Sequence, residues 1–332
     1  MHDGSAPSIP AWQSAAWITR PAELLTLLQL DPQSPALGPA ALRDFPLRVP
    51  LGFAARMAKG DPRDPLFLQV WPDPAEGLES PGFSSDAVGD LARLKPGGLI
   101  HKYRGRALVI STGACAVNCR YCFRRHFPYG EHLAARGHWR ETLAQLAADP
   151  SIEEVILSGG DPLSLDDAKL AELAGGLERI PHVRRLRLHT RTAVVLPERV
   201  DPALLGWLGR SRLQKVVVLH VNHPNEIDAA VERAVAGLRA AGASLLNQSV
   251  LLKGVNDDPA VLAALSERLF ACGVLPYYLH LLDRVQGVGH FEVDEIIAKK
   301  IMGELAARLP GYLVPRLARE LPGAPAKTLL PW

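Results

Sequence analysis

The sequence predicts an α/β protein whose main part is a partial, open-sided (βα)6 barrel, preceded by a helical, loop-rich region. From about residue 96 onward, short apolar runs alternate with stretches that have the periodicity of helices. The unit repeats roughly every 30 residues, as expected for βα pairs joined by right-handed crossovers. Six such pairs are too few for a closed eight-stranded barrel, so an incomplete barrel is favoured.

The predicted strands are short runs rich in apolar and branched residues, and the segments between them are longer and amphipathic. The strands are expected at 107–112, 153–158, 183–189, 215–221, 244–251 and 276–282. The helices are expected at 139–148, 166–178, 202–210, 226–241, 258–271 and 293–308.

The first part of the chain, residues 1–95, has a different character. It is rich in proline and shows short helical patterns such as 21–30, with no sustained strand alternation. We expect it to pack as a helical and loop region on a second unit, residues 96–332, which holds the barrel and the C-terminal segment.

Charge and composition limit the binding partners and the cellular compartment that we expect. The formal net charge is +2 and the pI is about 8.4, so no general attraction to nucleic acid or to a membrane surface is expected. The start of the chain lacks the basic and apolar segments of a secretory signal, and no apolar run is long enough to span a bilayer. These features predict a cytoplasmic protein.

Three cysteines form the strongest chemical signal. Cys115, Cys119 and Cys122 have the spacing Cys-x3-Cys-x2-Cys and follow a predicted buried strand directly. Thiolates are the preferred ligands of iron–sulfur clusters, and three of them would leave one iron of a 4Fe-4S cluster open to a small molecule. A zinc site with His126 or His132 as fourth ligand, or unligated thiols, are the alternatives. A disulfide framework is improbable in so large a chain with so few cysteines.

Polar side chains gather just past the predicted strands. Residues 158–161 read Ser-Gly-Gly-Asp and residues 220–224 read His-Val-Asn-His-Pro where two strands end, Asp283 follows a later strand, and Gln248 lies within another. In parallel α/β folds the site is built at the C-terminal ends of the strands, so these residues are predicted to face one mouth.

The cysteine loop followed by 158–161 resembles the radical S-adenosylmethionine (SAM) superfamily. Longer segments resemble lysine 2,3-aminomutase, a likeness that runs from about residue 96 to 328; the segments are 101–106, 222–226, 247–257, 276–283 and 289–291. Residues 281–287 and 311–320 are most similar to the short bacterial branch that supplies β-lysine for modifying elongation factor P. The chain lacks the C-terminal zinc-binding cysteines of the longer, fermentative enzymes.

This resemblance implies three cofactors: a 4Fe-4S cluster, SAM and pyridoxal 5′-phosphate (PLP). The positions that match SAM contacts are Ser158, Gly159, Gly160, His220 and Gln248. Lys327 matches the lysine that forms an imine with PLP, with Lys253 as the internal competitor, and Lys102, Tyr103 and Arg106 match positions near PLP. Without the resemblance, 101–106 would be read as a solvated basic turn.

The substrate positions carry complementary charges. Arg124 matches the arginine that holds the carboxylate of lysine, and Asp283 and Glu320 match the acids that receive its far ammonium. Two carboxylates facing one ammonium would reject a neutral or acidic side chain. Glu320 is one methylene longer than the aspartate of the fermentative enzymes.

The implied activity is the conversion of L-α-lysine to β-lysine, started by a 5′-deoxyadenosyl radical. The implied partners are the substrate lysine, a flavodoxin- or ferredoxin-type electron donor, and a functional link to elongation factor P and its ligase. Two alternatives stay open: an aminomutase for arginine or glutamate, and a cluster-binding adaptor that has lost catalysis.

Overall fold

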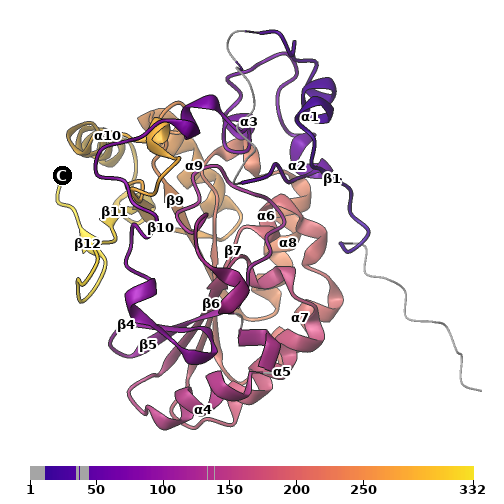
Figure 1. Cartoon of the computed structure of the whole chain (residues 1–332), viewed down its shortest axis with the longest axis vertical. Helices are drawn as coiled ribbons and strands as arrows, with labels where there is room; N and C mark the ends of the chain where they lie inside the picture. The colour runs from indigo at the N-terminus through magenta and orange to yellow at the C-terminus, as the bar shows by residue number, and fades with distance from the viewer. Residues whose placement is uncertain (1–11, 35–36, 38–44, 133, 138) are drawn as a thin grey trace, which may run out of the picture.

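A single open sheet organises the protein (Figure 1). The computed structural model describes residues 12–34, 37, 45–132, 134–137 and 139–332. The strands are β1 Trp17–Ile18, β2 Val49–Pro50, β3 Leu94–Lys95, β4 Leu99–Tyr103, β5 Arg106–Thr112, β6 Glu154–Gly159, β7 Arg185–Thr190, β8 Gln214–Leu219, β9 Ala243–Val250, β10 Leu275–His280, β11 Arg316–Arg319 and β12 Thr328–Leu329. The helices are α1 Pro21–Leu28, α2 Leu51–Ala54, α3 Pro65–Leu68, α4 Arg140–Ala148, α5 Asp167–Glu178, α6 Thr192–Val195, α7 Pro202–Arg210, α8 Ala229–Ala240, α9 Pro259–Ala271 and α10 Glu295–Arg308.

The described residues form a 10-stranded sheet in the order β12-β11-β10-β9-β8-β7-β6-β5-β4-β3. Strands β5 to β11 are parallel, and β3, β4 and β12 are antiparallel additions at the two ends. No pairing within the described chain joins β3 to β12, so the sheet does not close. The predicted partial (βα)6 barrel is confirmed.

All six predicted strands correspond to β5 to β10. The seventh parallel strand, β11, was not predicted because its four residues begin and end with arginine and do not form an apolar run. Strand β4 was missed for a similar reason, since it includes His101 and Lys102.

Aspartates define where the helices start. Each of α5, α7, α8, α9 and α10 has an aspartate at its N-cap whose carboxylate accepts a backbone N–H of the first turn, and α7 and α9 continue with proline. The predicted helix at 226–241 is therefore shorter than expected: Asp228 caps α8, which begins at Ala229. Residues 224–226 form a separate 3-10 turn.

Apolar and polar side chains alternate along the strands, so that one face of the sheet forms the core and the other lines the barrel interior. In β7, Leu186 and Leu188 are buried in the core that the sheet forms with its covering helices, which include α5, α7 and α8 (Figure 1). Because successive side chains of a strand point to opposite faces, Arg187 and His189 face the interior of the barrel. The open sheet thus presents polar side chains on its concave face.

The N-terminal region packs against the loop that carries the cysteines. Its core includes Leu24, Phe53 and Phe67, and the same cluster contains Ala116 and Val117 of that loop. Residues 1–11, 35–36 and 38–44 of the predicted N-terminal region lie outside the described residues. The division of the chain at residue 95 stays a prediction.

Within the described ranges, the apolar stretches of the helices fall short of what crossing a bilayer requires.

Candidate active site

The cysteine loop leaves the end of β5 and is tied to the N-terminal region by hydrogen bonds to its backbone groups. The Arg48 Nε donates to Cys115 O (3.0 Å), the Asn118 N–H donates to Arg48 O (3.0 Å), and the Arg120 N–H donates to Gln69 O (2.9 Å). All three cysteines of the loop are free and half-buried. The fold thus presents three thiols from one short segment at the mouth of the barrel.

The three thiols lie close enough to interact. Burial raises the pKa of Cys115 well above its ordinary value, and the neighbouring Asp161 and the other two thiols raise it further. Burial and the adjacent Cys119 raise the pKa of Cys122 to about 11. A thiol that is unfavourable as a bare anion is stabilised as a thiolate when it binds a metal centre.

The donor set fits an iron–sulfur cluster better than a single ion. Among the described residues, no three His, Cys, Asp or Glu side chains are grouped as ligands of one metal ion. His126 Nε2 instead lies 3.1 Å from Gln286 O, and His132 Nε2 lies 3.8 Å from the carboxylate of its neighbour Glu131. Three cysteine thiolates, with both histidines engaged elsewhere, match the ligands of a 4Fe-4S cluster and fall short of the four Cys or His ligands of a structural zinc site.

Glycines let the loop after β6 touch the cysteine loop. The N–H of Gly160 donates to Thr112 O (2.6 Å), and a side chain at Gly160 would collide with the carbonyl oxygen of Ala114. Gly159 has a φ of +116°, and an added Cβ would lie 2.6 Å from Thr112 O. The two glycines therefore pack against the backbone at the start of the cysteine loop, a contact that could not be predicted from the sequence.

The contact of Gly159 and Gly160 with the start of the cysteine loop is here called the glycine seam. The carboxylate of Asp161 fixes the end of β7 to this seam. Its carboxylate accepts hydrogen bonds from Thr190 Oγ1 (2.8 Å) and from the N–H groups of Arg191 (2.7 Å), Thr192 (2.8 Å) and Leu163 (3.0 Å). Four donors satisfy a buried carboxylate that would otherwise be costly to desolvate. Asp161 thus holds the ends of β6 and β7 in register.

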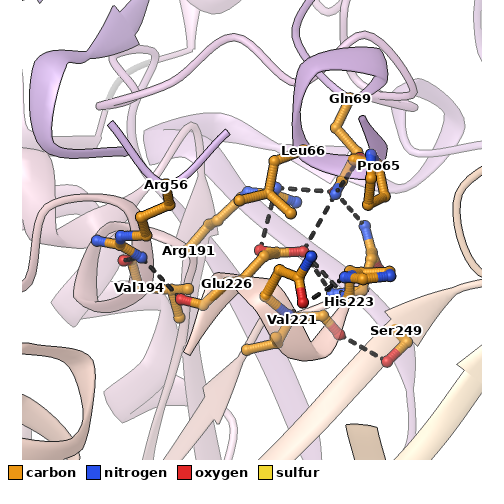
Figure 2. A network of polar contacts seen from close by, with 12 residues as sticks. Arg56, Pro65, Leu66, Gln69, Arg191, Val194, Val221, His223, Glu226 and Ser249 are labelled. Atoms are coloured by element: carbon orange, nitrogen blue, oxygen red, sulfur yellow. Dashed lines mark hydrogen bonds and ion pairs between the residues drawn. The ribbon is translucent and has the colours of Figure 1, made fainter. Parts of the chain in front are cut away.

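A buried polar network joins the N-terminal region to the ends of β7 and β8 (Figure 2). Gln69 Oε1 accepts from Arg191 Nη2 (2.9 Å) and Asn222 Nδ2 (2.9 Å), and Arg191 pairs with Glu226 at 3.3 Å. The network borders the cysteine loop: burial raises the pKa of Cys119, the nearby Arg191 lowers it, and Glu226 raises it. The network therefore contributes to the electrostatic surroundings of that thiol.

The residues that match SAM contacts lie on, or directly after, three of the parallel strands that form the mouth, β6, β8 and β9. Ser158 is the last residue of β6 whose side chain faces the interior of the barrel, and His220 follows β8 directly. Gln248 of β9 is paired in register with Tyr278 of β10. Burial, together with the positive charges of Arg191 and Lys327, lowers the pKa of His220 to about 3. The imidazole of His220 is therefore neutral at physiological pH.

The predicted substrate and PLP residues meet in a row of alternating charges. Arg124 Nε donates to Asp90 Oδ2 (2.7 Å), and Asp90 Oδ1 lies 2.5 Å from Lys102 Nζ. Lys102 Nζ also donates to Glu320 Oε1 (3.0 Å), and Glu320 Oε2 accepts from Lys327 Nζ (3.0 Å). Arg124, two residues past Cys122, is thus connected to the opposite edge of the barrel.

The two acids respond differently to this surrounding. Burial opposes ionisation of Glu320, but Lys327 and Lys102 hold its pKa at about 2. Burial and the negative charge of Glu320 raise the pKa of Asp283 to about 7. Glu320 is therefore a permanent carboxylate, whereas Asp283 gains or loses its proton near neutrality.

The aromatic and basic residues expected near PLP lie at the same edge. The guanidinium of Arg106 sits over the Tyr103 ring at 4.7 Å, and Lys327 Nζ lies 5.8 Å from the centre of the Tyr278 ring. Burial and Glu320 raise the pKa of Tyr103. Lys253, the competing lysine, is exposed on the loop after β9.

Sequence reasoning missed Asp90, which joins the two ends of this row. It lies in the N-terminal region, which we expected to be scaffold, and only 2% of its surface is exposed. No motif or periodicity marks a lone aspartate after a glycine, because both of its partners are distant in the sequence.

Comparison with known proteins agrees with this arrangement. Residues 109–264 match the Radical SAM superfamily, so the cysteine loop and the strands that follow it define a radical SAM protein. The L-lysine 2,3-aminomutase of Escherichia coli (strain K12) is 49% identical over 329 residues, covering 98% of this chain and 96% of that protein. That of Haemophilus influenzae is 50% identical, covering 94% and 92%. The chain belongs to the L-lysine 2,3-aminomutase family.

A more distant relative is longer. The L-lysine 2,3-aminomutase of Clostridium subterminale is 34% identical over 269 residues, which cover 81% of this chain but 64% of that protein. The family relationship implies the 4Fe-4S cluster, SAM and PLP as cofactors.

The glycine seam yields a test. Gly160→Ala should displace the cysteine loop, because the new methyl group would overlap the Ala114 carbonyl oxygen, and should lower the iron and sulfide bound after anaerobic reconstitution by about half or more. Gly303→Ala, in α10 where nothing lies within 4 Å of an added Cβ, is the matched control and should bind a full cluster. Equal iron contents in the two variants would contradict the assigned role.

Proposed function

We propose that the chain is a radical SAM, PLP-dependent lysine 2,3-aminomutase that converts L-α-lysine to β-lysine. The observation that carries the proposal is the row of charges between Arg124 and Lys327, with Asp283 beside it. At one end, Arg124 offers a positive charge for the carboxylate of the substrate. At the other end, Asp283 and Glu320 offer negative charges for its ammonium group, next to the amine of Lys327.

Arg124 is suited to a carboxylate. Its Nε donates to Asp90 Oδ2 (2.7 Å) and its Nη1 to Ser158 Oγ (3.0 Å), which uses two of the five N–H groups of a guanidinium. Asp90 and Ser85 belong with Arg124 to the lining of a small cavity between the N-terminal region and the cysteine loop. A guanidinium held on two sides retains donors for a carboxylate in a fixed direction.

The opposite end is suited to an ammonium group. Asp283 and Glu320 are close enough for the charge of one to raise the pKa of the other, so a second positive charge between them would be stabilising. A glutamate side chain would add a third negative charge there, and is disfavoured as substrate. Lysine fits both ends of the site.

The bound cofactors supply the difficult chemistry: the cluster and SAM provide a radical, and PLP provides a carbonyl group for an amine. Cys115, Cys119 and Cys122 would hold the cluster, and Ser158, Gly159, Gly160, His220 and Gln248 would border SAM. Lys327 would hold PLP through its amine, with Lys102, Tyr103 and Arg106 nearby. The chain orients the reactants and keeps water from them.

The biological role that we propose is the supply of (R)-β-lysine for modification of elongation factor P. The support is the resemblance of 281–287 and 311–320 to that branch, together with the nearly full-length match to the Escherichia coli and Haemophilus influenzae relatives. The proposal includes a cytoplasmic location, a flavodoxin- or ferredoxin-type electron donor and a functional link to the ligase of elongation factor P.

The direct test is an anaerobic assay of reconstituted protein with PLP, SAM and dithionite. Lysine should yield β-lysine, whereas arginine and glutamate should yield no β-isomer, as read by chiral chromatography. Cys119→Ala should yield no β-lysine, because one cluster ligand is missing. If wild-type protein reconstituted with a full cluster forms no β-isomer from any of the three amino acids, the adaptor is supported instead.

The lysine that carries PLP can be distinguished from its competitor. Lys327→Ala should abolish the absorbance of the imine with PLP and reduce turnover by about a hundredfold or more, because the other amine of the row, Lys102 Nζ, is already held by Asp90, Glu320 and Val88 O. Lys253→Ala removes an exposed amine and serves as the control, with both signals retained. Retention of the imine band in Lys327→Ala would move the assignment to another lysine.

The pKa of Asp283 predicts a pH dependence of lysine binding. Since an ammonium group binds the ionised carboxylate, affinity should rise with pH through about 7, where half of the Asp283 carboxyl groups are ionised, and should level off at higher pH. Below that pH the rise approaches about tenfold per unit. The measurement is calorimetric titration from pH 5.5 to 8.5 without SAM.

Asp283→Asn is the control for this titration. It should bind lysine weakly and should lose the part of the pH dependence that belongs to Asp283, while contributions of the substrate's own amine remain in both proteins. Parallel curves for wild type and variant would refute the assignment.

A further inference from the structure

The segment 84–91, here called the strap, runs from the N-terminal region across the mouth of the barrel. The Ser84 N–H donates to Arg284 O (3.0 Å) and the Gln286 N–H donates to Ser84 O (3.0 Å), which fixes the strap to the loop that carries Asp283. Within the strap, Asp86 Oδ1 accepts from the Asp90 N–H (2.9 Å). The strap is thus held on the loop after β10, and its own side chains set the position of Asp90.

Asp90 uses each carboxylate oxygen for a different cation. Oδ2 accepts from Arg124 Nε at 2.7 Å, and Oδ1 lies 2.5 Å from Lys102 Nζ. Burial alone would raise its pKa, but the two cations outweigh burial and keep the pKa below the ordinary value. A buried carboxylate shared in this way is a fixed negative charge between two positive ones.

Both cations are fully oriented as a result. Lys102 Nζ has three acceptors, Asp90, Glu320 Oε1 and Val88 O (2.8 Å), which match the three N–H bonds of an ammonium group. Arg124 is held by Asp90 at Nε and by Ser158 at Nη1, so the plane of its guanidinium is defined. Lys102 therefore acts as a link between acids and has no donor left for a ligand.

We propose that Asp90 is a positioning residue for substrate recognition, which directs Arg124 toward the carboxylate of the substrate and, through Lys102, fixes the distance from Arg124 to Glu320. This inference rests on the proposed function. It assigns the N-terminal region a part in selectivity, since Asp90 comes from the strap and every other member of the row comes from 102–327.

The test compares two ligands that differ only at the carboxylate. Lysine and lysinamide are titrated by calorimetry into protein loaded with its cluster and PLP, without SAM, so that no turnover occurs. Wild type should prefer lysine. Asp90→Asn should weaken lysine binding by about tenfold and reduce the preference over lysinamide, because a neutral amide holds Arg124 less firmly than a carboxylate does.

Asp90→Glu keeps the charge but moves it by one methylene, and should give a preference between those of wild type and Asp90→Asn. Glu153→Gln, which removes the half-exposed pair with Arg185 (3.3 Å) away from the row, is the control and should behave as wild type. Thermal unfolding of each variant identifies those that fold. If Asp90→Asn does not fold, Asp90→Glu decides the question.

Two outcomes would overturn the inference. An unchanged preference for lysine in a folded Asp90 variant would show that Arg124 does not depend on Asp90. Tighter binding of lysine would show that Asp90 competes with the substrate for Arg124. If wild type binds neither ligand, the proposed function itself fails, which is a distinguishable result.

Discussion

The site depends on alternation of charge in a buried place. Burying an ionised side chain is costly unless opposite charges and hydrogen bonds surround it. Here each acid of the row lies between two cations: Asp90 between Arg124 and Lys102, and Glu320 between Lys102 and Lys327. Neutralising Asp90, Lys102 or Glu320 would leave two like charges next to each other, so the row behaves as one unit that spans the barrel mouth.

Three parts of the chain converge on this unit. The N-terminal region supplies Asp90, the loop after β5 supplies Arg124, and the C-terminal segment supplies Glu320 and Lys327. The parallel sheet makes this convergence possible, because its strands deliver their C-terminal ends to one mouth while the helices bury the opposite face. The N-terminal region has a second role, since its core includes residues of the cysteine loop.

The sequence predicted what local patterns encode. Apolar runs located β5 to β10, and amphipathic stretches located the helices between them to within a few residues. The residues around the cluster and the acids were predicted from motifs. Strand β11 and Asp90 were not, because their roles arise from distant pairing: β11 becomes a strand by lying beside β10, and Asp90 is defined by Arg124 and Lys102. Neither signal exists within a short window of sequence.

The glycine seam between the cysteine loop and the loop after β6 has a practical consequence for protein design. The backbone of Gly160 lies directly against that of Ala114. The conformation of the cysteine loop therefore depends on its contact with residues 158–161 as well as on its own residues. A designer who transplants the three cysteines onto another barrel would have to carry residues 158–161 with them, as one interlocking piece.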